Sequence, residues 1–134
     1  MTATHQPVEY DLKIFCGATW RTELSYANGP GSPTPGPIDM AGWTAKMQVR
    51  ATRGNGVTEA APYGTLMIEL TTSNGGIVLN ADSTPGRIRL QMPASDTTQI
   101  IVSPARYDLE LTTNTGDVIR LMMGEALISE QVTL

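Results

Sequence analysis

Asp39 to Arg50 read Asp-Met-Ala-Gly-Trp-Thr-Ala-Lys-Met-Gln-Val-Arg. From Trp43 onward, apolar and polar side chains alternate without interruption. The apolar set is Trp43, Ala45, Met47 and Val49, and the polar set is Thr44, Lys46, Gln48 and Arg50. Because successive side chains of a strand point to opposite faces, this period of two predicts a strand with one buried and one wet face.

The same alternation recurs along the rest of the chain. Strands are expected at residues 8–16, 19–26, 43–50, 65–72, 77–79, 87–92, 107–113 and 118–123, with an extended segment at 125–133. The turn Ser73-Asn74-Gly75-Gly76 predicts that 77–79 pairs back on 65–72 as a hairpin, and Asn114-Thr115-Gly116-Asp117 predicts a second hairpin. Gly124 is expected to end the strand before it. A single helical turn is expected at 93–100, where Pro93 suits a helix start.

Short strands at intervals of about 8–12 residues are typical of a sandwich or barrel. We therefore expect an all-β fold, an immunoglobulin-like antiparallel β-sandwich with one short helical turn, over residues 8–134. A flexible N-terminal arm is expected at 1–7. A jelly roll is the alternative architecture.

Four residues are expected to define this fold. Trp43 matches the core Trp of the third strand, and Tyr107 matches the corner Tyr near the start of a late strand. Leu109 would take the place of the second cysteine of antibody domains. Trp20 would face the core from the second strand.

Composition narrows the classes of function. A chain of 134 residues can bury a core without a metal or disulfide. Its net charge of −4 gives no electrostatic support for binding nucleic acid or an anionic membrane. Charged residues make up only 16% of the chain, and a surface with so little charge often has a protein partner.

The single cysteine and the single histidine suggest no chemistry. Cys16 cannot form an internal disulfide, which favours folding in a reducing cytoplasm. No apolar run approaches the about 18 residues that span a bilayer, and the N-terminus lacks the regions of a secretory signal. His5 lies in the expected arm, and Cys16 has no basic cluster nearby in sequence. Neither is expected to be a nucleophile or a metal ligand.

One pair of carboxylates deserves comparison with a catalytic pair. Asp108 and Glu110 lie two apart on one strand, so they share a face at about 7 Å. Glycosidases use carboxylates at a similar separation. Arg87 and Arg89 have the same spacing on what could be a neighbouring strand, so cross-strand charge pairing of all four residues is expected instead. We expect no catalytic residue, no metal and no cofactor.

The segment from Ala27 to Pro37 contains Asn-Gly-Pro-Gly-Ser-Pro-Thr-Pro-Gly-Pro. This many prolines and glycines predict an exposed loop rather than a helix or sheet interior. A proline-stiffened loop loses little entropy on docking, so it is a candidate interface. The candidate interface residues are Asn28, Pro30, Pro33, Pro35 and Pro37. An unengaged solvent loop is the alternative interpretation.

Three stretches together resemble a known family. They are Gly17-Ala-Thr-Trp-Arg-Thr-Glu-Leu-Ser-Tyr26, Pro37-Ile-Asp-Met-Ala-Gly-Trp-Thr-Ala-Lys-Met-Gln-Val-Arg50 and a C-terminal set. That set is Tyr107-Asp-Leu-Glu-Leu111, Gly116-Asp-Val-Ile-Arg-Leu121, Gly124, Ile128 and Val132-Thr133. The chain resembles small bacteriophage virion proteins that are similar to the N-terminal domain of the baseplate upper protein family. The sequence stops after this one domain, where a full baseplate upper protein continues.

The resemblance implies a non-enzymatic structural protein of the virion, assembled in the host cytoplasm. We expect an immunoglobulin-like adaptor or attachment module of the tail, baseplate or fibre, with other virion proteins and copies of itself as partners. No nucleic acid, membrane or cofactor is expected. Capsid decoration is the first alternative. A carbohydrate-binding module is the second, and it would need an exposed aromatic platform such as Trp20 or Tyr63.

Overall fold

The computed structural model describes residues 7–52, 64–100 and 104–131. Within these residues the chain is almost entirely strand, with a 3-10 turn and one short helix. The strands are β1 (Val8–Glu9), β2 (Leu12–Phe15), β3 (Trp20–Ser25), β4 (Ala27–Asn28), β5 (Gly36–Pro37), β6 (Thr44–Ala51), β7 (Leu66–Thr71), β8 (Ile77–Leu79), β9 (Arg87–Met92), β10 (Ala105–Thr112) and β11 (Val118–Ser129). The 3-10 turn η1 spans Ala81–Ser83, and α1 (Ala94–Thr97) lies inside the expected helical turn.

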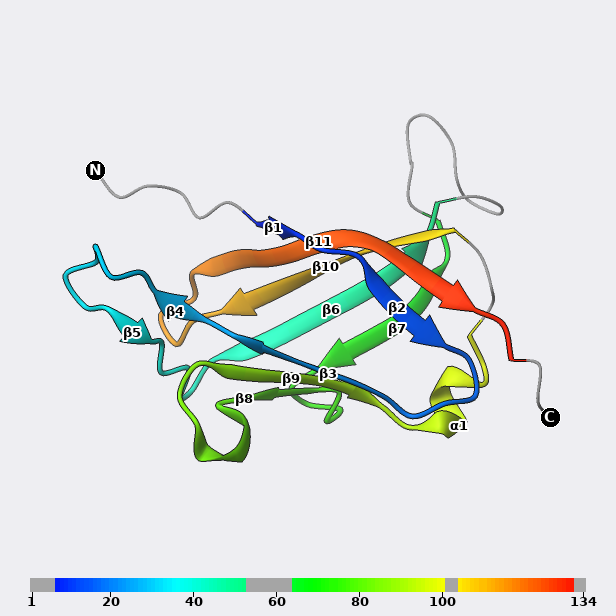
Figure 1. Cartoon of the computed structure of the whole chain (residues 1–134), viewed down its shortest axis with the longest axis horizontal. Coiled ribbons are helices and arrows are strands. Elements are labelled where there is room, and N and C mark those ends of the chain that lie inside the picture. The colour runs from blue at the N-terminus through cyan, green and yellow to red at the C-terminus, as the bar shows by residue number, and fades with distance from the viewer. Residues whose placement is uncertain (1–6, 53–63, 101–103, 132–134) are drawn as a thin grey trace.

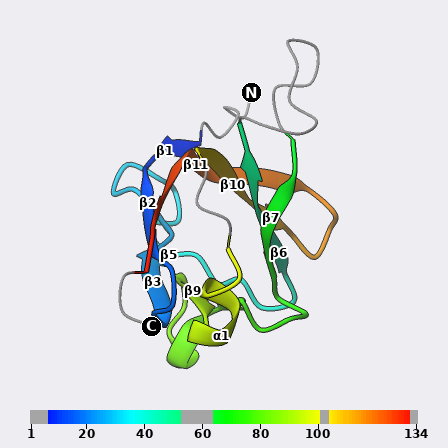
Figure 2. The ribbon, with the colours of Figure 1, turned by 90° about the vertical axis from the view of Figure 1, so that its right-hand side faces the viewer.

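Two sheets face each other as a sandwich (Figure 1, Figure 2). The larger has the order β1-β11-β10-β6-β7, with β2 also paired to β11, and the smaller has the order β3-β9-β8. The small hairpin of β4 and β5 projects from one end (Figure 1). The smaller sheet holds the B, E and D positions of an immunoglobulin sandwich, and the larger holds G, F and C with β7 added beyond C. The fold is an immunoglobulin-like β-sandwich.

The N-terminal strand departs from the common arrangement. In a constant-type immunoglobulin sandwich, strand A lies beside strand B. Here both β1 and β2 run parallel to β11, with Val8 opposite Met122 and Leu12 opposite Ala126. The smaller sheet therefore ends at β3, which has only β9 as a strand neighbour among the described residues.

The alternation at residues 44–51 is confirmed, and Trp43, expected on this strand, lies just before it and packs against the core. Every second side chain of β6 is buried, starting with Ala45. Trp43 precedes the strand in a turn in which its N–H donates to the Met40 carbonyl at 3.0 Å, and it is only half-buried. Trp20 on β3 is the buried one, at 7% exposure. Its indole N–H donates to the Lys13 carbonyl at 2.9 Å, which satisfies its polar atom.

Tyr107 and Leu109 are both buried in β10, as expected. The corner tyrosine of immunoglobulin domains bonds to backbone a few residues upstream. The Tyr107 hydroxyl instead donates to the carbonyl of Tyr10, in the bend between β1 and β2.

The prediction that Gly124 ends the strand before it was wrong. It pairs with Tyr107, and β11 continues through it to Ser129. A Cβ at Gly124 would overlap the Tyr10 carbonyl, so glycine lets the β1–β2 bend approach β11.

The hairpin at 114–117 is confirmed by the antiparallel pairing of β10 and β11, but the one at 73–76 was wrong. β8 pairs with β9 in the smaller sheet, so the chain crosses between sheets after β7. The side chain of Asn74 directs this crossing. Its Oδ1 accepts from the N–H of Thr71 and of Gly76, both at 2.9 Å, and its Nδ2 donates to the Glu69 carbonyl at 3.0 Å.

Candidate functional site

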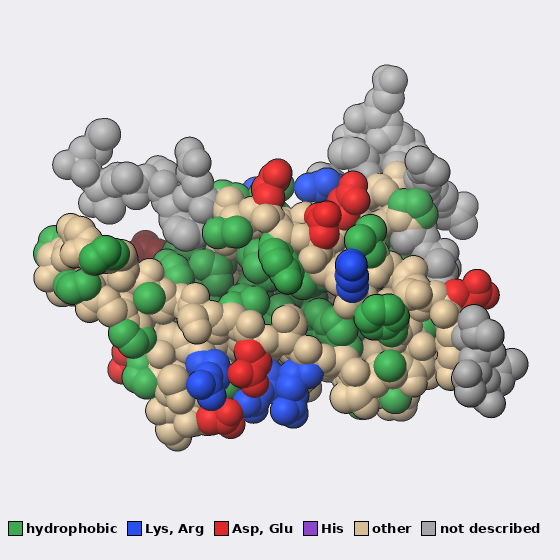
Figure 3. All heavy atoms as spheres, in the orientation of Figure 1, with side chains coloured by type: hydrophobic (Ala, Val, Ile, Leu, Met, Phe, Trp, Pro, Cys, Tyr) green, Lys and Arg blue, Asp and Glu red, His purple; other side chains and the backbone are tan. Residues whose placement is uncertain are grey.

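The proline-rich segment forms the projecting β4–β5 hairpin, and the five candidate interface residues are all exposed. Figure 3 shows apolar side chains along this projection, at its left. The hairpin holds its shape through local bonds, because Asn28 donates from Nδ2 to the Thr34 carbonyl at 3.0 Å and the Ser32 N–H donates to the Gly29 carbonyl at 3.0 Å. Pro37 pairs with Ala27 at its base. It is thus an exposed, pre-formed element.

The aromatic residues singled out from the sequence form no sugar-stacking platform. Trp20 and Tyr107 are buried in the core, and Trp43 is half-buried against it. Tyr63, named beside Trp20 as a possible platform, lies outside the described residues. Outside the core, the exposed aromatic side chains of the described residues are Tyr10 and Phe15, at 57% and 56%.

The expected charge pairing of the two arginines with the two acids was wrong, because the pairs lie in different sheets. Asp108 on β10 instead contacts Arg120 at 3.4 Å. Glu110 lies opposite Lys46 in the register of β10 and β6. The sequence does not show which acid pairs with which basic residue, because that depends on the order of the strands in the two sheets.

The two arginines of β9 bind Glu23 on the neighbouring strand β3 and Asp82 in the turn η1. Arg89 reaches Asp82 at 2.6 Å and Glu23 at 2.8 Å, and Arg87 reaches Asp82 at 3.3 Å. The hydrogen bond and charge of Arg89 hold the pKa of Asp82 below its ordinary value, and Asp82 and Glu23 raise the pKa of Arg89. Asp82 and Glu23 are exposed and Arg89 is largely covered, so the cluster lies at the surface, where ion pairs contribute little to stability.

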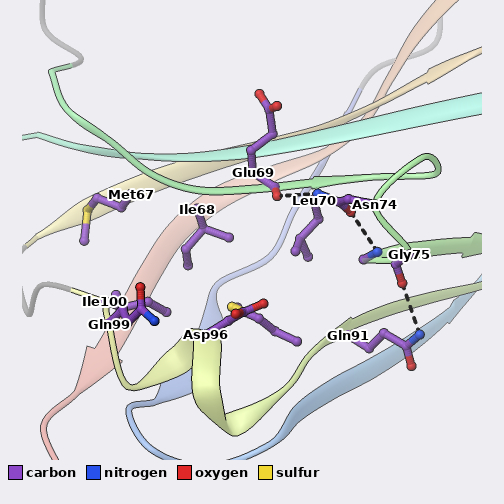
Figure 4. Close-up of a pocket in the computed structure, with 12 residues that line it drawn as sticks. Met67, Ile68, Glu69, Leu70, Asn74, Gly75, Gln91, Asp96, Gln99 and Ile100 are labelled. Atoms are coloured by element: carbon purple, nitrogen blue, oxygen red, sulfur yellow. Dashed lines mark hydrogen bonds between the residues drawn. The ribbon is translucent and has the colours of Figure 1, made fainter.

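A hollow of about 390 Å³ lies between β7, α1 and the turn at 73–76 (Figure 4). Its wall includes Ile68, Leu70 and Ile100, and Gln91 closes one side by donating from Nε2 to the Gly75 carbonyl at 3.1 Å. Its two acids do not form a pair, since Figure 4 shows the Glu69 carboxylate directed away from Asp96. The hollow is lined by both polar and apolar side chains, and its two acids have no convergent acid–base geometry.

Cys16 is half-buried, and its thiol lies 3.8 Å from the Ile100 carbonyl. His5 lies outside the described residues. In the part of the chain that the structure describes, no three His, Cys, Asp or Glu side chains gather as a metal site. No helix there is long and apolar enough to cross a membrane.

The feature that sequence reasoning missed is the outer edge of β3. The alternation at 19–26 predicts the strand and its inward face, but it carries no signal for which strands lie beside it. Only the pairing of β1 and β2 with β11 leaves this edge without a neighbour among the described strands.

No family model and no curated protein matches this sequence. Among the solved structures that are similar to it are the following three. A chicken TCR is 10% identical to this chain, with a TM-score of 0.45. The match covers 96% of this chain and 56% of the TCR chain, so this chain spans about half the length of that one. The extracellular domain of a voltage-gated sodium channel β4 subunit, described in parallel homodimers with a role in cell–cell adhesion, is 6% identical with a TM-score of 0.36 and covers 98% of this chain and 100% of its own. Extracellular domains 3–5 of Drosophila OTK are 15% identical with a TM-score of 0.33, covering 98% of this chain and 35% of that chain. The strand order of the two sheets defines the immunoglobulin-like fold of this chain.

Proposed function

We propose that this chain is a non-enzymatic, immunoglobulin-like contact module of a bacteriophage virion, an adaptor or attachment element of the tail, baseplate or fibre. Its partners are other virion proteins and further copies of itself, and it is assembled in the host cytoplasm. The resemblance of three stretches to the baseplate upper protein family supports the virion assignment. It covers β3, β6 and the hairpin of β10 and β11, which belong to both sheets of the sandwich.

The observation that carries the contact role is the projecting β4–β5 hairpin. Its prolines are exposed and its backbone is fixed by internal bonds such as that from Asn28 to Thr34. A pre-formed element loses little conformational entropy when it docks. The hairpin therefore supplies a rigid apolar contact to a neighbouring virion protein.

Capsid decoration remains the second candidate, because a sandwich with exposed edges suits a repeated surface contact equally well. A carbohydrate-binding module is less well supported. Of its two named platform residues, Trp20 is buried, and the other lies outside the described residues.

The test is the copy number of this protein in purified particles, measured by quantitative mass spectrometry against the major capsid protein. A small multiple of the threefold or sixfold symmetry of a tail supports the adaptor role. Hundreds of copies would assign it to capsid decoration. Absence from the particle would overturn the virion assignment.

A variant experiment tests the hairpin itself. Replacing Pro33 and Pro35 with Ala removes contact area and stiffness, so we expect fewer copies per particle with normal folding of the isolated protein. Pro85→Ala is the matched control, since Pro85 is an exposed proline of another loop. Equal incorporation of both variants would remove the hairpin from the contact surface.

A further inference from the structure

The pairing of β3 with β9 shows which residues of β3 point their backbone groups to the outer edge. In an antiparallel pair, alternate residues bond to the partner strand. The Tyr26 N–H donates to the Gly86 carbonyl at 2.7 Å, just beyond the last β3–β9 pair, so the even-numbered residues of β3 bond to β9. The backbone groups of Arg21, Glu23 and Ser25 therefore point to the outer edge. No described residue bonds to them there.

Other sheet edges of the described chain are covered or short. On β7, the Asn74 side chain occupies the edge groups of Glu69 and Thr71. On β2, the indole of Trp20 bonds to the Lys13 carbonyl. β8 is only 3 residues long. Natural sheets protect their edges in such ways, and β3, at 6 residues, is a long edge without a comparable backbone cap.

A groove runs beside this edge, between β3 and the β1–β2 segment. It is lined by the exposed aromatics Tyr10 and Phe15 and by Trp20 and Thr22 of β3. Figure 3 shows apolar side chains in the hollow between the two sheets on this face. Leu24 points toward the core but is only half-buried, because no strand covers this side.

We propose that β3 pairs antiparallel with β3 of a second copy of this chain, around a two-fold axis at Thr22. This inference rests on the proposed contact function and names one partner and one surface for it. Arg21 then lies opposite Glu23 of the second copy, and Trp20 lies opposite Leu24 of that copy. By symmetry each pair occurs twice. The two smaller sheets become one continuous sheet across the dimer.

Two features select this register: the charges that meet across the axis, and the alternate residues whose backbone groups point outward. In this register, Arg21 of each copy exchanges main-chain hydrogen bonds with Glu23 of the other copy. Both are residues whose backbone groups point outward. Both side chains lie on the exposed outer face, so opposite charges meet. A two-fold axis at Arg21 or at Glu23 places like charges directly opposite each other, which destabilises the pair. A shift of one residue reverses the faces of the incoming strand.

The dimer also explains the aromatics beside the edge. Tyr10 and Phe15 line the groove that borders β3, so a second copy along β3 shields them from water. Burial of such apolar area adds to the main-chain bonds of the added strand. The edge and the two exposed aromatics thus form one contact surface.

A charge-exchange experiment tests this register. Sedimentation equilibrium over a wide concentration range should show a reversible dimer for the unchanged protein. Arg21→Glu and Glu23→Arg each place like charges opposite each other in the homodimer, and each should weaken dimerisation by about tenfold or more. Mixing the two variants restores opposite charges at both pairs, so the mixture should dimerise like the unchanged protein.

Two further variants keep the test decisive. Lys46→Glu changes the charge equally on the other sheet and should leave the dimer unchanged. Glu23→Arg loses its contact to Arg89 and could for that reason fail to fold. Ser25→Pro avoids this problem, because it removes an N–H at the outer edge of β3 and leaves the bonds to β9 in place. It should therefore weaken the dimer without unfolding the protein.

A protein that stays monomeric at every concentration would overturn the proposal. So would a dimer that Arg21→Glu and Ser25→Pro leave intact, because the copies would then meet through another surface. A monomer present in purified particles contradicts this inference alone. A dimer absent from particles contradicts the proposed function alone.

Discussion

Replacing Tyr107 with Phe removes one hydroxyl from the core and nothing else. That hydroxyl donates to the Tyr10 carbonyl and ties β10 to the bend between β1 and β2. Tyr107 is only 4% exposed, so water cannot readily replace the bond. Losing a buried hydrogen bond and leaving its acceptor unsatisfied costs about 1–3 kcal/mol of unfolding free energy. We expect the free energy of unfolding to fall by that amount at neutral pH.

The same substitution has a signature at alkaline pH. Burial, followed by the charges of Asp11 and Tyr10, raises the pKa of Tyr107 well above its ordinary value. The folded protein therefore keeps a proton that the unfolded chain releases above about pH 10. Stability is unaffected below that pH and falls above it, by up to about 1.4 kcal/mol per pH unit. Tyr107→Phe should lose this part of the slope, while a smaller part from Tyr26, whose pKa burial also raises, remains.

Urea unfolding followed by tryptophan fluorescence, at neutral pH and above pH 10, measures both effects. At neutral pH, Tyr10→Phe is the matched control, because it removes a hydroxyl from a side chain that is 57% exposed and leaves the Tyr10 carbonyl in place. The control should change the free energy of unfolding by less than about 0.5 kcal/mol. Equal stability of Tyr107→Phe and Tyr10→Phe, or an unchanged alkaline slope, would refute the reasoning.

Three further substitutions test the packing and the capped edge. Gly124→Ala places a methyl group on the Tyr10 carbonyl and should cost about 1–3 kcal/mol in thermal or urea unfolding, whereas Gly31→Ala, with open space around it, should cost almost nothing. Asn74→Ala frees the edge of β7 and should both destabilise the fold by about 1–2 kcal/mol and increase aggregation in light scattering, unlike Asn114→Ala in an exposed turn. Trp20→Ala should cost about 3–5 kcal/mol in urea unfolding, and a cost below about 1 kcal/mol would contradict its place in the core.

Periodicity predicted the strands well, because the alternation of apolar and polar residues within a strand identifies its buried face without knowledge of its neighbours. The inward side chains of β6 and β10 are the ones that the alternation selected, and α1 lies where Pro93 suggested a helix start. Turn chemistry was less reliable. Asn114 to Asp117 closes a hairpin, whereas Asn74, with a similar signature, redirects the chain to the other sheet. The difference lies in long-range packing, since β8 finds its partner in β9.

The candidate contact residues were predictable only in part. Proline and glycine content identified the exposed hairpin, because those residues restrict the backbone locally. The partners of Arg89 and the free edge of β3 were not predictable, because both depend on which strands become neighbours. Trp43 packs against the core less deeply than the alternation suggests, because the turn that begins at Met40 places the methionine at the buried position.

Amide hydrogen exchange along β3, resolved by residue in dilute and in concentrated protein, tests the claim that this edge is a contact surface most directly. In dilute solution the amides of Arg21, Glu23 and Ser25 should exchange quickly, while those of Thr22 and Leu24, bonded to β9, should exchange slowly. In concentrated solution all five should exchange slowly as the second copy covers the edge. Slow exchange of the three edge amides in dilute protein, or no slowing on concentration, would contradict the account.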